Sequence, residues 1–588
     1  MMKHFTYTFC ITSLTLLFGC GGNSGGSNAE NNPSQICEIE GIYVDATSGS
    51  DSNAGTNSCE PWQSLFHTFA NISDGATVFL KRGETWGEGI IIENSQIEID
   101  AYGAGSPPLL SGSVRVSDWT SQGDAIFSAA PILTLGQILG HVTQNDEVMF
   151  FQEWNTDAQT SLTSAPNDSF TYDNSTNTVY IKISDDPSEH SYAVSVEARG
   201  VYVDGFSGIS INNIHIDGFS LHGIEFKNCD TCSAEDVVIE QIGGATISDG
   251  SGNPVYAGNG IEFTNSSNNG RVENTTISEV FDSCLSPQTY ASNQTLSNIL
   301  FSNSVVSECG FAGIEISVLS NGGSTSSQIR TIEIDGLIIE QSGKGWSGQR
   351  FNSEGYGIRI QSDSGAGSVS GVDIRRSEIS GSVNSGIRGT GDVNHIEIEQ
   401  SRIYNNDNHG IDISEPTQSS PLLNLSASVI SGNNNYGINF NCASCQGLQI
   451  LHNTFYENGV INLAIFNQDN LAEIKNNVFN SENNMTHIFS NNSLIGVTLD
   501  HNCYTTHTNM FGYGGETYSD LSSFTSAESL ETNGVTNVIV QVAAPLERNY
   551  QLIDGSVCIG IGDIMSNITE DFLGAPYSSP PSAGAFAR

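Results

Sequence analysis

The chain has 588 residues, with 19 basic and 65 acidic side chains and a formal net charge of −46. A surface this acidic lacks the large basic patch that a phosphate backbone requires, so we expect no nucleic-acid partner. The length fits several domains or one repeat architecture, so internal repeats must be examined before domains are counted.

The N-terminal segment predicts export and a lipid anchor. A mostly apolar stretch, residues 9–18, is too short to span a bilayer and is typical of a signal peptide. It ends in Leu-Phe-Gly before Cys20, which resembles a bacterial lipobox, so we expect residues 1–20 to be a lipoprotein signal peptide lipidated at Cys20. An ordinary signal peptide is the alternative. Residues 21–36 are mostly Gly, Ser and Asn and predict a flexible linker.

These features predict a lipoprotein of the outer membrane or cell surface, with a secreted or periplasmic location as the alternative. The membrane would be contacted only through the lipid. No other segment has 18 apolar residues in a row, so no second membrane span is expected.

The cysteine count supports an oxidising compartment. Twelve Cys are present, and ten remain after Cys10 in the signal segment and Cys20 are set aside. An even number in an exported chain predicts disulfides. The two Cys-x-x-Cys pairs could instead bind zinc, but they lie far apart in the sequence. From the spacing we expect the pairs Cys37–Cys59, Cys229–Cys232, Cys284–Cys309, Cys442–Cys445 and Cys503–Cys558.

After the linker, four regions follow in chain order. Residues 37–105 are expected to form an N-terminal cap and the first coils. Residues 106–200 break the repeat period and include a hairpin-like run at 172–182, which predicts a β-rich insertion. Residues 201–510 hold the repeat, and residues 511–588 lose it. Because the ends of a solenoid must be covered, we expect the last region to be a C-terminal cap.

The repeat consists of short β-strand patterns separated by Gly and Asn turns. One apolar residue marks each unit. The last five gaps between markers are 24, 27, 25, 24 and 25 residues, and the gap before them is 40 residues. Three short strands in about 25 residues are one coil of a β-solenoid, whereas a propeller blade needs about 40 residues. Turn residues such as Asn405, Asn433 and Asn458 could stack along the axis. The markers are Ile216, Ile239, Ile277, Val306, Ile339, Ile379, Ile403, Ile430, Phe455, Phe479 and Tyr504.

Motifs at both ends resemble those of the pectate-lyase-like β-helix superfamily. The opening segments are 43–45, 49–56, 61–62, 80–86 and 101–103, and the closing segments are 571–574 and 584–586. The resemblance implies an all-β, right-handed parallel β-helix of about eleven or more coils. The superfamily contains polysaccharide lyases, glycoside hydrolases, epimerases and tailspike-like binders. The Asn-Thr-Asp and paired-Asp motifs of polygalacturonases are absent, as is the Asp-Pro-His motif of alginate epimerases, and fold alone does not choose a function.

A second marker, Gly-Ile, predicts which side chains face outward. Because side chains alternate along a strand, the residue after each inward Ile points away from the core. The outward row is then Glu225, Glu262, Ser286, Glu315, Arg359, Arg388, Asp412 and Asn439. The next row is Lys227, Thr264, Ser317, Gln361, Thr390, Ser414 and Asn441, and His222, Asn259, Tyr356, His409 and Tyr436 lie on the adjoining turns. The alternative is a plain solvated face.

Two chemistries fit this row. A lyase must neutralise a uronate carboxylate, remove the C5 proton and protonate the leaving oxygen, and Arg359 and Arg388 could hold the carboxylate. The other catalytic candidates are Tyr356, His409, Asp412 and Glu315, with His409, Tyr356 or Lys227 as the proton carrier. The candidate substrate-binding residues are Trp346, Lys344, Arg350, Lys227 and Asn439, and Trp346 could stack on a sugar ring. Glu225, Glu262 and Glu315 could hold Ca²⁺ through oxygen ligands.

A glycoside hydrolase needs two carboxylates about 5 to 5.5 Å apart for retention, or about 6.5 to 9.5 Å apart for inversion. Glu225 and Glu262 lie one coil apart, near the first spacing, and Glu262 and Glu315 lie two coils apart, near the second. The arginines would then bind sulfate or carboxylate on the substrate. A non-catalytic glycan-binding surface protein is a third possibility. We expect a monomer that cleaves an acidic polysaccharide, with β-elimination slightly favoured.

Overall fold

The computed structural model describes residues 37–248, 254–319, 326–346, 354–416, 423–442, 447–466, 472–483, 485–494, 496–538, 540–565 and 567–587. Residues 39–588 form one compact unit. The predicted signal peptide, its Cys20 and the linker to residue 36 lie outside the described residues, as does Arg350. No helix among the described residues is long and apolar enough to cross a membrane.

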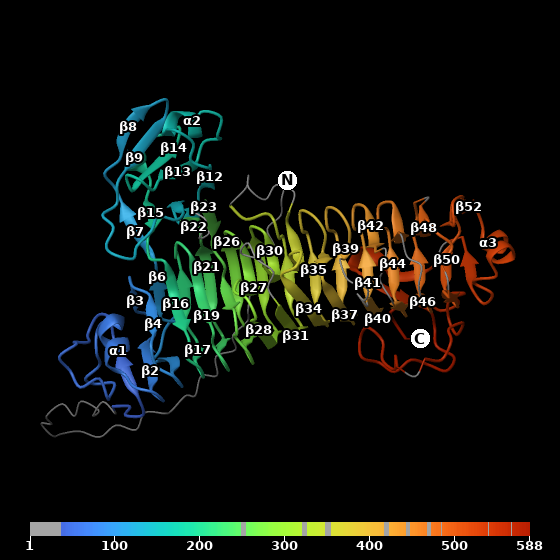
Figure 1. The fold of residues 1–588 in the computed structure, drawn as a ribbon, viewed down its shortest axis with the longest axis horizontal. Coiled ribbons are helices and arrows are strands. Elements are labelled where there is room, and N and C mark those ends of the chain that lie inside the picture. The colour runs from blue at the N-terminus through green and yellow to red at the C-terminus, as the bar shows by residue number, and fades with distance from the viewer. Residues whose placement is uncertain are drawn as a thin grey trace, which may run out of the picture. The chain divides into compact units, whose positions relative to one another are not determined.

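Three long β-sheets, here named A, B and C, build the solenoid (Figure 1). Each coil runs from sheet C to sheet A to sheet B. Sheet A comprises β1 (Ile42–Val44), β2 (Thr77–Lys81), β5 (Glu98–Tyr102), β17 (Ser210–Asn212), β20 (Ser233–Glu235), β25 (Arg271–Glu273), β28 (Thr295–Ser302), β31 (Ser327–Asp335), β34 (Gly367–Arg375), β37 (Val393–Glu399), β40 (Leu423–Ser426), β43 (Leu448–Leu451), β46 (Ala472–Lys475) and β49 (Thr498–Asp500).

Sheet B has the same parallel order. It comprises β3 (Thr85–Trp86), β6 (Leu109–Ser111), β18 (His215–Asp217), β21 (Val238–Ile242), β26 (Thr276–Val280), β29 (Val305–Cys309), β32 (Ile338–Glu340), β35 (Glu378–Ser380), β38 (Arg402–Tyr404), β41 (Val429–Ser431), β44 (Thr454–Tyr456), β47 (Val478–Asn480), β50 (Cys503–Thr505) and β53 (Val535–Asn537).

Sheet C is parallel except for its last strand, which pairs antiparallel. It comprises β4 (Ile90–Ile92), β16 (Arg199–Asp204), β19 (His222–Lys227), β24 (Ile261–Thr264), β27 (Ser283–Thr289), β30 (Ala312–Val318), β33 (Tyr356–Ser362), β36 (Ile387–Gly391), β39 (Ile411–Pro416), β42 (Tyr436–Asn441), β45 (Ile461–Phe466), β48 (Thr486–Ser490), β51 (Phe511–Tyr513) and β52 (Glu516–Tyr518).

The interior is a continuous apolar core made by the inward residues of every coil. The inward residues of β19, Ile224 and Phe226, are fully enclosed, and the same positions of β24 hold Ile261 and Phe263. β-branched and aromatic side chains fit such a pleated surface, which is why these short segments form strands. Near the C-terminal end, the rings of Phe455, Phe479 and Tyr504 stack with centroids 4.8 and 5.2 Å apart.

Asparagine ladders tie the coils together at the turns. Asn406 donates to Asn433, and Asn433 donates to Asn458, each at 2.9 Å. The ladder confirms the stacking predicted for Asn433 and Asn458, but in the preceding coil the stacked residue is Asn406. The side chain of Asn405 lies one turn position away, and Asn405 has a positive φ of 54°.

The insertion forms two small sheets beside the first coils. They comprise β7 (Ser113–Val116), β8 (Thr120–Gly123), β9 (Ile126–Ala129), β10 (Val142–Gln144), β11 (Glu147–Val148), β12 (Phe150–Phe151), β13 (Ser169–Asp173), β14 (Thr178–Lys182) and β15 (Tyr192–Ser195), with α2 (Ala158–Leu162) and the 3₁₀ turn η1 (Pro187–Glu189). The insertion is shorter than the predicted 106–200, because β6 and β16, which flank it, already pair with solenoid strands.

The remaining elements close the ends and decorate one corner. Near the N-terminus, α1 (Leu65–Asn71) packs Leu65 and Phe69 onto the core. The hairpin β22 (Ala245–Ser248) and β23 (Pro254–Ala257) leaves the corner between sheets B and C. The C-terminal elements are α3 (Leu521–Glu528), η2 (Pro545–Glu547), β54 (Val542–Ala544) and β55 (Asn549–Leu552). The coils extend beyond the predicted end at 510, since β51 and β53 still pair with strands of sheets C and B.

The disulfides follow the predicted pattern. Cys229–Cys232, Cys284–Cys309 and Cys503–Cys558 are bonded. Cys37, Cys59 and Cys442 are also in disulfides, and Cys445, the predicted partner of Cys442, lies outside the described residues. Because disulfides persist in oxidising compartments, these bonds fit an exported protein.

Candidate functional site

The strand register of sheet C brings the predicted outward row together. Glu225 is the partner of Glu262, which is the partner of Ser286 on the next strand. Glu315 is the partner of Arg359, and the register continues through Arg388, Asp412 and Asn439 on successive strands. The row also begins one coil earlier, with Tyr202 beside Glu225. The alternation of side chains along a strand was therefore sufficient to predict this row.

The row is much more enclosed than a solvated face. Relative exposures are 7% for Glu225, 2% for Glu262, 7% for Glu315 and 2% for Asp412. Carboxylates this deep require partners or a retained proton, because burying an unpaired charge is costly. The alternative of a plain solvated face therefore does not describe these coils, and each carboxylate has a distinct set of neighbours.

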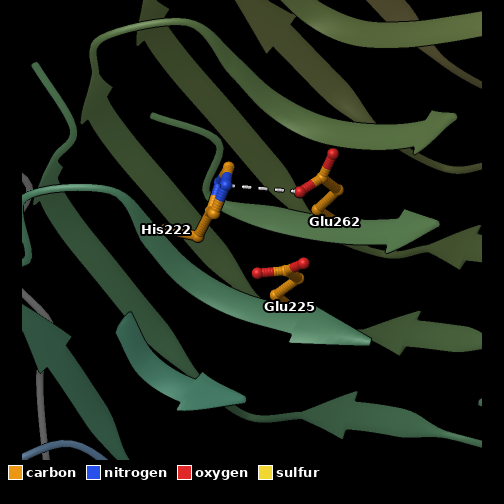
Figure 2. Close-up of side chains that lie close together, drawn as sticks. All are labelled: His222, Glu225 and Glu262. Atoms are coloured by element: carbon orange, nitrogen blue, oxygen red, sulfur yellow. Dashed lines mark ion pairs between the residues drawn. The ribbon is translucent and has the colours of Figure 1, made fainter. Parts of the chain in front are cut away.

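In the acidic half of the row, which runs from Glu225 to Glu315, Glu262 lies next to Glu225 and His222 (Figure 2). Its Oε1 accepts a hydrogen bond from the Tyr290 hydroxyl at 2.8 Å, and its Oε2 lies 3.5 Å from His222 Nε2. Burial, reinforced by the charge of Glu225, raises the pKa of the Glu262 carboxyl to about 8. At neutral pH this carboxyl therefore keeps its proton.

Glu225, one strand away, has a different environment. It accepts a hydrogen bond from Nε of Arg199, an ion pair contributed by the neighbouring strand β16. A carboxylate oxygen of Glu225 lies within 4.8 Å of one of Glu262 and of a His222 ring nitrogen. A guanidinium favours the charged carboxylate. The two glutamates thus place an ionised carboxylate beside a neutral carboxyl group. Neither Arg199 nor Tyr290 directly follows a Gly-Ile pair, so the sequence pattern did not indicate them.

His222 is held as a neutral hydrogen-bond donor. Its Nδ1 accepts the backbone N–H of Asn259 at 3.2 Å, so the ring proton is on Nε2, which faces Glu262. Burial lowers the pKa of His222 to about 4, so the ring is uncharged at neutral pH.

The predicted calcium ligands are not arranged as expected. Within the described ranges, two clusters bring three possible ligands close together, His222–Glu225–Glu262 and Asp373–His395–Glu397, and neither includes Glu315. Glu315 instead accepts hydrogen bonds from Ser283, Gln288 and Ser317 at 3.1, 2.7 and 2.9 Å. A metal on Nε2 of a neutral His222 would require the proton on Nδ1, where the Asn259 contact blocks it. The first cluster therefore fits proton chemistry better than metal binding.

In the basic half of the row, Arg359 and Arg388 lie over the ring of Tyr356. The guanidinium carbons of Arg359 and Arg388 lie 5.0 and 6.0 Å from the centroid of Tyr356. Arg359 donates through Nε and Nη2 to Gln361, at 2.9 and 2.7 Å. Burial lowers the pKa of Arg359 and raises the pKa of Tyr356. The register thus stacks two cations on adjacent coils, as predicted.

Asp412 neutralises part of this charge. It accepts a hydrogen bond from Arg388 Nη1 and another from Asn439 Nδ2 at 2.9 Å. His409 precedes it in the same way as His222 precedes Glu225, in the motif His-Gly-Ile-acid. Its Nδ1 accepts the backbone N–H of Tyr436 at 3.2 Å, and burial lowers its pKa. His409 is therefore a neutral donor, which disfavours the predicted role as a proton acceptor.

Three other predicted site residues have a different setting. Trp346 is packed rather than displayed, with its ring 5.0 Å from Phe281 and its Nε1 donating to the Glu279 carbonyl at 3.1 Å. Trp346 is thus partly buried, and its stacking on a sugar stays a prediction. Lys344 lines a hollow beside Glu340 on sheet B, away from the row. Lys227 pairs with Asp204 at 2.9 Å, which raises the pKa of Lys227 and makes it a poor base.

Comparison with known proteins identifies the fold. A family described as a right-handed β-helix region matches residues 324–479. The structure of XylC with xylose has a TM-score of 0.54 at 11% identity, covering 93% of this chain and 98% of that chain. Pectate lyase Pel9A has a TM-score of 0.38 at 14% identity, with 94% and 97% covered. A GH136 lacto-N-biosidase from Eubacterium ramulus has a TM-score of 0.35 at 12% identity, with 84% and 66% covered.

No curated protein matches the sequence. The family match over residues 324–479, the three parallel sheets and the likeness to XylC together show that this chain has a right-handed parallel β-helix fold. The fold predicted from the repeat and the end motifs is confirmed.

Proposed function

We propose that this protein is an exported enzyme that cleaves polysaccharide, and that the geometry of sheet C best supports hydrolysis with retention at Glu225 and Glu262. The observation that carries the proposal is the neutral Glu262 carboxyl beside the Arg199-paired Glu225. A carboxyl group that keeps its proton is suited to be the acid, and a neighbouring carboxylate paired with a guanidinium is suited to be the nucleophile. Their separation, within 4.8 Å, is closer to the retaining than to the inverting spacing.

In this mechanism a Glu225 oxygen attacks the anomeric carbon as the glycosidic C–O bond breaks. Glu262 transfers its proton to the leaving oxygen, so the first product departs as an alcohol. Glu262, now a carboxylate, then takes a proton from water, and the water oxygen displaces Glu225 from the anomeric carbon. This returns the proton to Glu262 and releases the second product.

The fold likeness to the xylose complex of XylC supports a sugar as the ligand. The disulfides support export, and we propose that Cys20 carries the lipid and that the protein acts as a monomer. Calcium at Glu225 and Glu262 stays a weaker proposal, because Ca²⁺ prefers several oxygen ligands and Glu315 is not available to complete the set.

β-Elimination is the second candidate, favoured by Arg359 and Arg388 lying side by side over Tyr356. The arginines would hold a uronate carboxylate, and Tyr356 would exchange the proton. The contacts favour it less, because Arg388 already holds Asp412, and both Lys227 and His409 are unsuited to accept a proton.

The test is an activity assay of the purified protein on neutral, uronate-containing and sulfated polysaccharides, with and without EDTA. We expect reducing ends to rise with no ultraviolet absorbance from an unsaturated uronate, and EDTA to have no effect. Glu225→Gln and Glu262→Gln should each lower the rate by at least about a hundredfold. Glu235→Gln is the matched control, since Glu235 is exposed on sheet A of the same coil.

Other outcomes are equally decisive. Ultraviolet absorbance rising together with reducing ends would move the chemistry to Arg359, Arg388 and Tyr356. Full activity in Glu225→Gln or Glu262→Gln would reject the assigned pair. Binding of polysaccharides with no turnover of any would favour a glycan-binding surface protein.

A further inference from the structure

The basic half of the row, Arg359 and Arg388, concentrates positive charge in a chain that has few basic residues. Arg359 and Arg388 are direct strand partners, in a protein with 19 basic residues and a net charge of −46. Like charges directly opposite each other on neighbouring strands are destabilising. A single ring, Tyr356, lies beside both guanidinium groups. An anion that contacts both guanidinium groups would offset the repulsion between them.

The hydrogen bonds of the two arginines leave capacity for such an anion. Arg388 uses Nη1 on Asp412, while its Nε is enclosed and has no hydrogen-bond partner. Arg359 uses Nε and Nη2 on one acceptor, Gln361. Asp412 pairs with Arg388 and is itself held by Asn439, and the strand partner of Arg359 on the other side is Glu315, whose pKa burial raises. N–H groups of both arginines remain for a ligand.

The position of this pair relative to the carboxylates is set by the coil spacing. Counting along the partners, Glu262 is followed by Ser286, Glu315 and then Arg359, which is three strand steps. At about 4.8 Å for each step, Arg359 lies about 14 Å from Glu262 along the row. A sugar residue in an extended chain is about as long as one coil is thick. A glycan lying along sheet C would thus place its third residue from the cut bond at the arginines.

We propose that Arg359, Arg388 and Tyr356 form an anion subsite that recognises a carboxylate or sulfate group of the glycan about three sugar residues from the bond that is cut. This inference rests on the proposed hydrolysis at Glu225 and Glu262, which it deepens by naming an acidic substrate. The forked guanidinium group matches the paired oxygens of either anion. In β-elimination, by contrast, the recognised carboxylate belongs to the sugar at the cut bond.

The binding half of the experiment needs no turnover. Sodium glucuronate, sodium sulfate and glucose are titrated into the full protein at constant ionic strength, and binding is measured by calorimetry. We expect glucuronate, sulfate or both to bind, and glucose not to. Arg359→Gln should weaken anion binding at least tenfold, while Glu262→Gln should leave it unchanged. The response to the two anions distinguishes a uronate substrate from a sulfated one.

A second variant guards against loss of folding. Arg388→Gln combined with Asp412→Asn replaces the ion pair with two amides, and it should also weaken anion binding at least tenfold. Equal anion affinity in wild type, Arg359→Gln and this double variant would overturn the subsite. If neither glucuronate nor sulfate binds to the wild-type protein, the proposed anion subsite is overturned as well.

The second half of the experiment measures the distance between the acidic sugar and the bond that is cut. It uses oligosaccharides of a cleaved polysaccharide, each with one acidic residue, and the products are identified by mass spectrometry. The expected cut lies about three residues from the acidic sugar, and this preference should disappear in Arg359→Gln. An acidic residue always at the newly formed end would overturn the proposed spacing. Anion binding without hydrolysis would reject the proposed function and leave the anion subsite standing, so the two failures are distinguishable.

Discussion

Glu225 and Glu262 carry the same functional group one strand apart, and their neighbours give them different protonation states. Arg199 stabilises the charge on Glu225, whereas burial and the charge of Glu225 itself keep the proton on Glu262. A pair of this kind divides the roles of nucleophile and acid at one pH. In the proposed hydrolysis, the protonation of Glu262 would therefore set the alkaline limit of activity.

The first prediction concerns that limit. Glu262 must be protonated to act, so kcat/KM should fall above pH about 8, by about tenfold for each further pH unit. The Tyr290 hydroxyl lowers the pKa of Glu262 by hydrogen bonding to the carboxylate. Tyr290→Phe should therefore move the alkaline limb to higher pH. A pH profile whose alkaline limb stays in place, or moves to lower pH, would reject Glu262 as the acid.

Residues in the row differed in how well the sequence predicted them. The Gly-Ile marker fixed which side chains share a face, so Glu225, Glu262 and Arg388 were predicted together. Burial of the row was not predictable, because it depends on Tyr290 and Arg199, which lie outside the marker. The packing of Trp346 was not predictable either, because its partner, Phe281, belongs to a coil far from it in the sequence.

At the scale of elements, ladders of amides hold the coils in register, and one ladder ends on a buried acid. Asn453 donates to Asn477 at 3.1 Å, and Asn477 donates to Asn502 at 2.9 Å. Beyond the last ladder residue, Glu531 accepts from Asn502 Nδ2 and from the Tyr504 hydroxyl, each at 2.5 Å. Burial raises the pKa of Glu531 to about 7. The C-terminal end of the ladder is thus closed by a carboxyl group that titrates near neutrality.

The second prediction follows from the sign of that shift. A carboxyl whose pKa is higher in the folded than in the unfolded state stabilises the fold fully below the unfolded value, and this contribution is lost as pH rises through about 7. The shift from 4.5 to about 7 corresponds to at most about 3 kcal/mol. Glu531→Gln should therefore reduce the fall in the free energy of unfolding between pH 5 and pH 8, as measured by urea denaturation. An unchanged pH dependence would contradict this account of the cap.

Strand existence and register were predictable at this scale, whereas the ends of the regions were not. Sheets B and C continue to β53 and β51, past residue 510, because strand pairing does not require the Gly-Ile marker. The same holds for β6 and β16, which pair within the solenoid although the sequence between them breaks the period.

At the scale of the whole molecule, three excursions from the coils leave at one corner, between sheets B and C. The insertion precedes β16, the β22–β23 hairpin precedes β24, and the segment containing Trp346 precedes β33. Contacts join them: Tyr172 of the insertion binds the Gly244 carbonyl and Thr246 Oγ1, and Trp346 packs near Phe170. These excursions therefore gather beside the strands that carry Glu225, Glu262 and Arg359. The sequence predicted an insertion but carried no signal for its contacts.

The anomeric configuration of the first product tests the central claim most directly. Wild-type protein would be mixed with a cleaved oligosaccharide and followed by proton NMR before mutarotation. Attack by Glu225 and then by water inverts the anomeric carbon twice, so the account predicts retention of configuration. An inverted first product would mean that a water molecule attacks directly, and it would contradict the assignment of Glu225 and Glu262 as nucleophile and acid.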